Sequence, residues 1–379
     1  MTRPLRVGIS GSYGGLNLGD EAILQVILRD LRESLPVEVT VFSRDPTDTL
    51  RRHHVEHAVP ARRLSRKETV SVIESLDLFI LGGGGILYEA DAESYLREVV
   101  VAREKNVPVM VYAVSVGPLL SPFTRALVRD VLGGVAVITV RDRPSRQLLD
   151  EIGLQKEITV TADPALLLAP EPLTLEEILR AEAIDPDANL IGLSVREPGP
   201  AAPDLDVEHY HQLLANAADF MVDRYDAETV FIPMERRVFD VQHSHGVVSR
   251  MRHAQHATVL KREYTSGQVL SLLGHFRFCV GMRLHFLIFS ALADVPFVAL
   301  PYAPKVTGFL EELDLEAPAI GQVSAGQLIA HVDRAWDTRE QRRARVREAL
   351  PGLQARARRN HEIVSRLLAE VRAAAPVSV

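Results

Sequence analysis

An arginine and a histidine two residues apart open an apolar, helix-like run in the second half of the chain. Arg283 and His285 follow an apolar stretch that ends in glycine, and Lys305 lies in the turn after the next apolar stretch. Ligands of open parallel α/β sheets collect at the carboxyl ends of strands, where helix N-termini also offer free N–H groups. Two cations and an imidazole at such positions predict a pocket for a small anion. The alternative is that Arg283 pairs with a carboxylate and that His285 fills a core position.

Two further arginines stand at the ends of apolar stretches. Arg141 follows the stretch 135–140, and Arg196 comes just after the stretch 190–194. We expect both to add positive charge to the same site, because three or four cations and one histidine suit a small, highly charged ligand. For Arg141 the alternative is a surface ion pair with the neighbouring Asp142.

Glycine-rich turns follow two of the strand-like stretches in the first half of the chain. One brackets Asn17 and Asp20, and the other is the four-glycine run 82–85. A bare backbone directly after a buried strand is expected where a ligand approaches closely. We therefore take Asn17, Asp20, Gly83 and Gly84 as candidates for substrate binding. The alternatives are that Asn17 or Asp20 caps the following helix, and that the four glycines form a plain loop.

Composition narrows the class of protein. The chain has 379 residues, of which 47% are hydrophobic, and this length favours two domains. A net charge of -7 argues against bulk binding of nucleic acid, which needs a basic face. A single cysteine excludes an intrachain disulfide, and no long apolar segment suggests a signal or a membrane span. We expect a soluble, cytoplasmic protein.

Strand-like and helix-like stretches alternate along the chain, which predicts α/β domains with parallel sheets. Prolines interrupt the alternation near residue 170, and it restarts at Leu190. We therefore expect two Rossmann-like domains facing a cleft, over 1–172 and 186–337. A C-terminal helical segment, 338–379, follows and is interrupted at Pro351-Gly352. Ser65 and Glu68 have the spacing of a capping box at the start of a helix.

Three other features are interpreted as structural. Asp204 and Asp206 resemble the D-x-D of metal-dependent glycosyltransferases, but they directly precede a helix and capping is the better explanation. Four histidines lack the spacing of a metal site and suit solvated helix positions; they are His243, His245, His253 and His256. The arginine-rich run 339–359 suits a solvated helix face. It leaves open a peripheral contact with an anionic membrane surface.

The ordered set of motifs resembles the polysaccharide pyruvyltransferase family over about residues 5–315. The motifs are Asn17-Leu18-Gly19-Asp20-Glu21, the run Gly82–Gly85, Val140-Arg141-Asp142, Asp163-Pro164 and Gly281-Met282-Arg283-Leu284-His285. The resemblance is closest to the branch that pyruvylates bacterial cell-wall polymers used to anchor surface layers. It implies a fold like the GT-B glycosyltransferases, phosphoenolpyruvate as the donor, and no cofactor or metal. It also implies a sugar acceptor, which we expect to be lipid-linked.

The resemblance also assigns roles to residues. It implies that Arg141 and Lys305 bind the donor's charge, that His285 transfers a proton, and that Arg283 is the arginine beside that histidine. The chemistry fits, because a guanidinium matches a carboxylate and cations stabilise a departing phosphate. The glycine-rich opening differs from the commoner form of the family, since Leu16 intervenes before Asn17.

Two other functions remain open at this point. A nucleotide-sugar glycosyltransferase of the same fold would share the basic residues that bind a diphosphate. A non-catalytic sugar- or anion-binding scaffold would share the fold, although the presence of His285 with Arg141, Arg283 and Lys305 argues against it. No feature of the sequence sets the oligomeric state.

Overall fold

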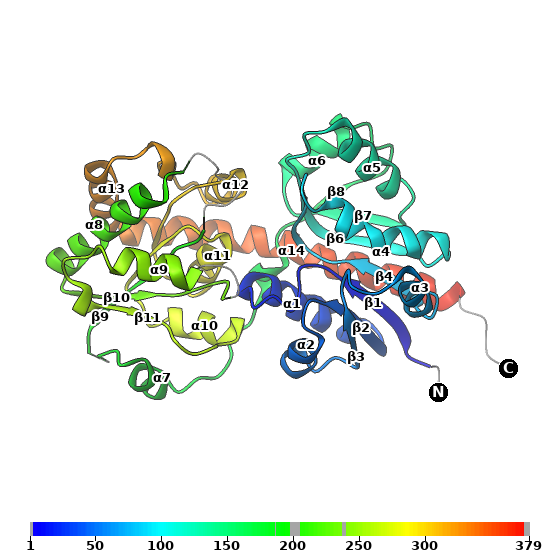
Figure 1. Cartoon of the computed structure of the whole chain (residues 1–379), viewed down its shortest axis with the longest axis horizontal. Helices are drawn as coiled ribbons and strands as arrows, with labels where there is room; N and C mark the ends of the chain where they lie inside the picture. Colours follow the sequence, from blue (N-terminus) through cyan, green and yellow to red (C-terminus); the bar gives the residue numbers. More distant parts are fainter. Residues whose placement is uncertain (1–2, 186, 198–204, 237–239, 375–379) are drawn as a thin grey trace. The chain divides into compact units, whose positions relative to one another are not determined.

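The computed structural model describes residues 3–185, 187–197, 205–236 and 240–374 (Figure 1). The chain divides into two compact units. The first unit contains residues 1–15, 20–168 and 354–379, and the second contains 16–19 and 169–353. Neither unit is a continuous piece of chain. A four-residue segment near the N-terminus belongs to the second unit, and the end of the C-terminal helix belongs to the first.

The first unit is built on an eight-stranded sheet with the order β3-β2-β1-β4-β6-β7-β8, in which β5 pairs with β6 and all pairs are parallel. The strands are β1 (Leu5–Ser10), β2 (Val37–Ser43), β3 (His57–Pro60), β4 (Leu78–Leu81), β5 (Gly84–Leu87), β6 (Val109–Val116), β7 (Val137–Val140) and β8 (Thr159–Val160). The central strands are apolar along their whole length, as parallel strands covered on both faces must be.

Helices connect these strands, and all of them except α4 begin at a residue whose side chain accepts a hydrogen bond from the first turn. They are α1 (Leu18–Ser34), α2 (Pro46–His53), α3 (Arg66–Ile73), α4 (Ala92–Glu104), α5 (Pro122–Leu132) and α6 (Arg143–Glu151). The predicted capping box is confirmed, because Ser65 accepts a hydrogen bond from the Glu68 backbone and Glu68 accepts one in return. Asp142 caps α6, so the residue after Arg141 is committed to the helix start.

The second unit has a five-stranded parallel sheet with the order β11-β10-β9-β12-β13. Its strands are β9 (Asn189–Ser194), β10 (Ala227–Phe231), β11 (Ala257–Val259), β12 (Phe278–Gly281) and β13 (Phe297–Ala299). Its helices are α7 (Leu175–Glu182), α8 (Val207–Tyr225), α9 (Asp240–Val248), α10 (Ser266–Leu273), α11 (Leu284–Leu292), α12 (Pro304–Glu312) and α13 (Ala325–Asp337). The predicted α/β class with two Rossmann-like domains is confirmed.

Strand order reverses once in each sheet. β4 returns to lie beside β1 in the first unit, and β12 returns to lie beside β9 in the second. Helices leave the two neighbouring strands on opposite sides at such a point, so the backbone opens a crevice at the carboxyl ends. The residues that follow β1, β4, β9 and β12 are therefore the places to look for a ligand.

The C-terminal helix α14 (Arg339–Ala374) is continuous, so the predicted interruption at Pro351-Gly352 is wrong. Figure 1 shows it as one long helix. A proline within a helix costs about 3 kcal/mol through a lost hydrogen bond. Val346, Leu353 and Ala357 are buried on either side of Pro351, and this packing sustains the helix across it.

The remaining structural interpretations can be checked in the same way. Asp206 caps α8 by accepting a hydrogen bond from the backbone of His209 at 2.9 Å, as predicted, whereas Asp204 lies outside the described residues. Arg343 and Arg347 on α14 both pair with Asp294, which places part of the arginine-rich run against the protein. In the described ranges no helix is both long and apolar enough to cross a membrane.

Candidate functional site

His285 lies in the first turn of α11, directly after the carboxyl end of β12. Its imidazole occupies the space above Gly19, where a β-carbon would overlap ring atoms Nδ1, Cγ and Cε1. Only glycine allows this approach. Two motifs from opposite ends of the sequence therefore meet within the second unit.

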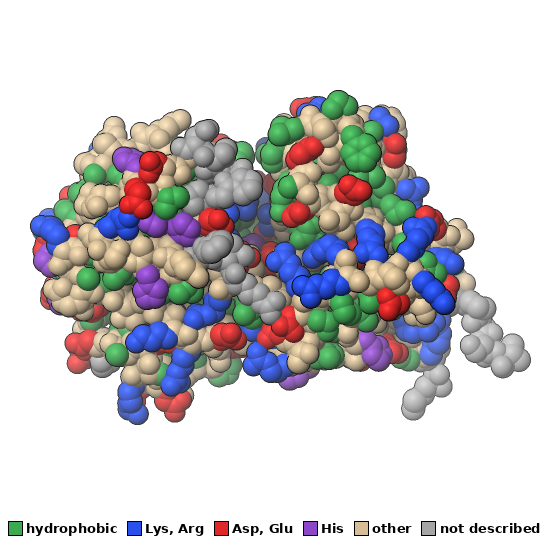
Figure 2. Space-filling model, in the orientation of Figure 1, with side chains coloured by type: hydrophobic (Ala, Val, Ile, Leu, Met, Phe, Trp, Pro, Cys, Tyr) green, Lys and Arg blue, Asp and Glu red, His purple; other side chains and the backbone are tan. Residues whose placement is uncertain are grey.

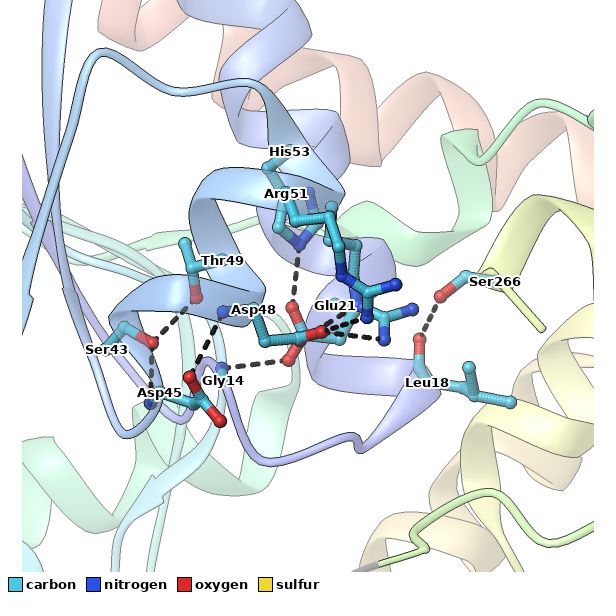
Figure 3. Close-up of polar contacts among 11 residues, drawn as sticks. Gly14, Leu18, Glu21, Ser43, Asp45, Asp48, Thr49, Arg51, His53 and Ser266 are labelled. Atoms are coloured by element: carbon cyan, nitrogen blue, oxygen red, sulfur yellow. Dashed lines mark hydrogen bonds and ion pairs between the residues drawn. The ribbon is translucent and has the colours of Figure 1, made fainter. Parts of the chain in front are cut away.

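The segment 16–19 is held in the second unit by its backbone. Leu18 N–H donates to the carbonyl of Met234 at 2.8 Å, and Asn17 forms an antiparallel bridge with Glu235. Ser266 donates its hydroxyl to the carbonyl of Leu18 at 2.6 Å (Figure 3). Asn17 Oδ1 accepts a hydrogen bond from Gly19 N–H at 3.0 Å and so caps α1, as the structural alternative for Asn17 predicted. Its role as a substrate ligand stays a prediction.

Arg283 is paired with two carboxylates. Its Nε and Nη2 donate to Asp240 at 3.0 and 2.5 Å, and Nη2 lies 3.1 Å from Oε2 of Glu235. Burial raises the pKa of Asp240, while the Arg283 guanidinium opposes that rise. Asn17 donates to the same oxygen of Glu235 at 3.3 Å. This arrangement matches the alternative in which Arg283 serves the fold, and it links Arg283 to the segment beneath His285. Direct contact between Arg283 and substrate stays a prediction.

Arg196 and Lys305 are brought together by a residue that the sequence reasoning did not select, Tyr302. Arg196 Nη1 donates to the Tyr302 hydroxyl at 2.7 Å, and its guanidinium carbon lies 4.4 Å from the centre of the tyrosine ring. Lys305 Nζ lies 5.7 Å from the same ring centre. Tyr302 is buried, whereas Lys305 is exposed at the start of α12. Its place three residues before Lys305, in the turn after β13, was the signal that could have drawn attention to it.

Electrostatics mark this group as a site for negative charge. Burial would raise the pKa of Tyr302, but Lys305, Arg196 and Arg283 together lower it to about 8. The same positive potential that acidifies the phenol would attract a carboxylate or a phosphate.

Behind Arg196 lies a cluster of Tyr210, His211 and His243. The Tyr210 hydroxyl donates to the carbonyl of Arg196 at 3.1 Å and contacts Nδ1 of His243 at 2.5 Å. His211 Nε2 lies 2.8 Å from the same His243 nitrogen. Burial lowers the pKa of both histidines, that of His211 to about 4. The predicted solvated position is therefore wrong for His243, which packs in a neutral cluster that holds the backbone of Arg196.

Arg141 is a buried residue of the first unit. Its Nη1 donates to Asp163 at 2.5 Å and its Nε donates to Ser115 at 2.6 Å. Only 4% of its side chain is exposed, and Asp142 lies at 3.9 Å. The ion pair with Asp142 is therefore present, as the alternative has it, but Arg141 is buried rather than at the surface and its shorter ion pair is with Asp163. A β-carbon at Gly85 would lie 3.5 Å from Nη2 of Arg141, so this nitrogen faces the glycine run.

Most of the glycine run serves internal packing. A β-carbon at Gly82 would overlap the hydroxyl of Tyr13, whose ring is fully buried beside it. A β-carbon at Gly83 would lie 3.0 Å from the side chain of Ile23. Gly83 is buried, and so it does not line an open surface. Gly84 has a φ of +103°, and its β-carbon would lie 3.3 Å from Oδ1 of Asp20. Of the four glycines only Gly85 is exposed.

The acid next to Asp20 has a clear structural role. Glu21 is buried, accepts from the Gly14 N–H at 2.9 Å, and contacts Nε2 of His53 at 2.7 Å. Figure 3 shows Glu21 in contact with His53, the last residue of α2, and it shows Asp45 and Asp48 at the start of that helix. The carboxylate closes the glycine-rich turn after β1. Sequence reasoning singled out Asp20 and missed this pair, because His53 is distant in sequence.

The predicted residues thus fall into two sets. Arg141, Asp20, Gly83 and Gly84 belong to the first unit. His285, Arg283, Arg196, Lys305 and Asn17 belong to the second. Within the second unit the structure joins Arg196 to Lys305 through Tyr302, and Asn17 to Arg283 through Glu235.

One group of possible metal ligands is found among the described residues, and it lies apart from these sets. Asp30, Glu33 and His361 offer atoms within 4.8 Å of one another. Asp30 already accepts hydrogen bonds from Tyr112 at 2.7 Å and from Arg29 at 3.2 Å. Arg29 also pairs with Glu33 at 4.0 Å, so both carboxylates already have a cationic partner and this group fits an ion-pair cluster.

Comparison with known proteins supports both the fold and a family. Residues 17–304 match the sequence model of a family described as polysaccharide pyruvyl transferase. A search of curated protein sequences finds no match. Solved structures align over nearly the whole chain at low identity, which is informative for the fold alone.

Three of these structures illustrate the similarity. A Listeria monocytogenes protein assigned as a UDP-N-acetylglucosamine 2-epimerase has a TM-score of 0.69 at 12% identity, covering 97% of this chain and 98% of that one. A glycosyltransferase from Rickettsia africae has a TM-score of 0.63 at 12% identity, with coverages of 97% and 99%. The UDP-GlcNAc 2-epimerase from Neisseria meningitidis, bound to UDP-GlcNAc, has a TM-score of 0.62 at 11% identity, with coverages of 96% and 99%.

Proposed function

The chain belongs to the polysaccharide pyruvyl transferase family, and we propose that it moves the pyruvyl group of phosphoenolpyruvate onto two hydroxyls of one sugar. The product is a pyruvate ketal on a cell-wall polysaccharide precursor, and phosphate is released. The observation that carries this proposal is the position of His285. Its imidazole is held over Gly19 at the start of α11, in the unit that also holds Arg196 and Lys305.

His285 serves the proton transfers of the reaction. His285 gives a proton to the methylene carbon of the donor, which leaves an oxocarbenium-like centre at the neighbouring carbon. One sugar hydroxyl attacks that carbon, the bond to phosphate breaks, and a second hydroxyl of the same sugar closes the ring. One hydroxyl proton returns to His285 and the other leaves with the phosphate. Imidazole suits this exchange because its charge changes near neutral pH.

Cations balance the charge of the donor. Phosphoenolpyruvate carries a carboxylate and a phosphate, and both need positive partners. In the second unit Arg196 and Lys305 are positioned by Tyr302, and we assign them to the donor. For Arg141 of the first unit we propose anion binding through Nη2, which faces Gly85, since Nη1 and Nε are taken by Asp163 and Ser115.

The acceptor is proposed to be a sugar on a phosphate-bearing lipid carrier. Arg44 follows β2, and Arg62 and Arg63 follow β3, so three cations lie at neighbouring strand ends in the first unit. The Arg62 guanidinium lies 4.3 Å from the ring centre of Tyr95, and Arg97 holds the turn by donating to the carbonyl of Arg62 at 3.1 Å. Figure 2 shows Lys and Arg side chains gathered on the visible face of this unit, over α3 and α4. We call Arg44, Arg62, Arg63 and Arg97 the arginine face. It suits a diphosphate.

A donor screen tests the proposal against its alternatives. Phosphoenolpyruvate at about 100 times its dissociation constant should stabilise the protein by about 2.7 kcal/mol in thermal unfolding. UDP- and GDP-sugars should not. Stabilisation by a nucleotide sugar alone would identify a glycosyltransferase of the same fold. Donor binding without phosphate release, with every sugar acceptor tried, would identify a non-catalytic anion-binding scaffold.

A further inference from the structure

Tyr302 is a buried phenol surrounded by positive charge. It accepts a hydrogen bond from Arg196 at 2.7 Å, the Arg196 guanidinium also lies against its ring, and Lys305 lies 5.7 Å from the ring centre. Only 9% of Tyr302 is exposed. Packing of the ring alone does not require two cations beside it. When it ionises, the phenol is a group that supplies negative charge to both.

Six other tyrosines show the opposite shift. Burial raises the pKa of Tyr13, Tyr88, Tyr112, Tyr210, Tyr225 and Tyr264. Tyr302 is buried as well, and burial alone would raise its pKa too. Lys305, Arg196 and Arg283 outweigh burial and bring the pKa to about 8. The difference comes from the residues around the ring.

We propose that Tyr302, where it is ionised, is the internal counter-anion of Arg196 and Lys305, and that it takes up a proton when the anionic donor binds to these two cations. This inference rests on the proposed function, because it takes the donor to be phosphoenolpyruvate. The step is a simple protonation. The phenolate oxygen accepts a proton from solvent, no bond to the donor forms, and the positive charge of Arg196 and Lys305 passes from the phenolate to the ligand.

The groups that face Tyr302 come from three elements. Arg196 follows β9, Lys305 lies on α12, and Arg283 caps α11 with its charge met by Asp240 and Glu235. Tyr210 donates to the carbonyl of Arg196, and His243 contacts Tyr210 in turn. The neighbouring Glu197 acts on both Tyr210 and His243 through its charge. Burial raises the pKa of Tyr210 and lowers that of His243, so neither changes its charge near pH 8. Tyr302 is therefore the group around Arg196 that titrates in this range.

Linkage gives the sign of the effect. A bound anion offsets the charge of the cations, so the pKa of Tyr302 is higher in the complex than in the free protein. A group whose pKa rises on binding takes up protons, about half a proton near pH 8, where Tyr302 is half ionised in the free protein. Donor affinity is then greatest below about pH 8 and falls by up to about tenfold for each pH unit above it.

Near-ultraviolet absorbance of tyrosinate measures this ionisation directly. We expect the wild-type protein to show one tyrosine ionising near pH 8, and phosphoenolpyruvate to move that ionisation upward. Tyr302→Phe should remove the signal. Tyr264→Phe is the matched control, because Tyr264 is in the same unit and donates to Glu182 at 2.6 Å. It should leave the signal unchanged.

Calorimetry in buffers of different ionisation enthalpy completes the test. Wild type and Tyr264→Phe should take up protons on binding phosphoenolpyruvate at pH 8, whereas Tyr302→Phe should bind it without proton uptake and with a flat affinity between about pH 7 and about pH 9. Donor binding by wild type with no proton uptake, or an unchanged uptake in Tyr302→Phe, overturns this inference and leaves the proposed function standing. Failure of wild type to bind phosphoenolpyruvate overturns both.

Discussion

The imidazole of His285 lies where the side chain of any residue other than glycine at position 19 would have to be. Gly19 itself is fixed by the cap from Asn17 and by the backbone bonds of Leu18 to Met234 and Ser266. The His285 ring therefore packs on Gly19, which belongs to the second unit although it lies near the N-terminus of the chain. The orientation of the imidazole depends on this contact.

Replacing Gly19 by alanine should displace His285. The ring has to rotate away from the new methyl group, and a misplacement of about 1 Å can reduce turnover by about 10²-fold. Phosphoenolpyruvate affinity should change little, because Arg196 and Lys305 are untouched. Steady-state kinetics and a donor titration measure the two effects. Gly326→Ala, at a helical site with no atom near the new methyl group, is the control and should keep full activity.

Removing the imidazole separates chemistry from packing. His285→Ala should lower turnover by about 10²–10⁴-fold, the usual contribution of a positioned acid. Donor affinity should be largely kept. If His285 only filled the core, the same change would leave a cavity and lower the melting temperature, with activity lost through unfolding. A folded His285→Ala protein that still forms pyruvate ketal at nearly the wild-type rate would rule out the catalytic role.

Arg141 should prove important to both stability and donor binding. Arg141→Ala leaves Asp163 buried without its cation, a change that costs about 3–5 kcal/mol when a buried pair is broken. The double variant Arg141→Gln/Asp163→Asn removes both charges and should recover most of that stability in denaturant unfolding. It should not recover phosphoenolpyruvate affinity. Wild-type donor affinity in the stable double variant would show that Arg141 serves the fold alone.

The arginine face predicts an effect on the acceptor. Arg62→Ala/Arg63→Ala should raise the KM for a lipid-linked acceptor by up to about fivefold for each charge pair lost, because one exposed pair contributes up to about 1 kcal/mol. Added salt should shrink the difference from wild type, since it screens such contacts. Donor affinity should be unchanged. Lys261→Ala/Arg277→Ala, which removes two exposed cations of the second unit, is the matched control. Equal KM values for the two double variants would argue against this acceptor surface.

Most of the strands were predictable because each signal is local, but β3 and β5 were not, since β3 is only partly buried and β5 begins within the glycine run. A short apolar stretch such as Leu78–Leu81 forms a buried strand in an α/β protein. The capping box of Ser65 and Glu68 indicates the start of the helix that follows it. The helix through Pro351 was not predictable. Proline is a local signal for a break, but the burial of Val346 and Leu353 that overrides it depends on the tertiary structure.

Site residues were predictable as types and positions, but their partners were not. Strand-end position correctly placed Arg196 and Lys305 in one unit, yet nothing in the sequence shows that Tyr302 lies between them. Gly82 and Gly83 correctly indicated that other atoms pack closely against the backbone. Those atoms belong to the side chains of Tyr13 and Ile23, whereas the sequence had suggested a ligand. Arg141 lies beside Asp142 in sequence and pairs with Asp163 in space.

The division of the chain has a consequence for how the protein is made. The first unit, although its strands are synthesised first, also contains residues 354–374, where the buried amide of Asn360 bonds with Thr139 and Thr161. The second unit also includes residues 16–19, which leave the ribosome before any of the strands of that unit. Those four residues must therefore stay available until β10 and α10 have formed. Neither half of the gene encodes a complete folding unit, so a cut at residue 168 would yield two fragments that each lack a piece held by the other.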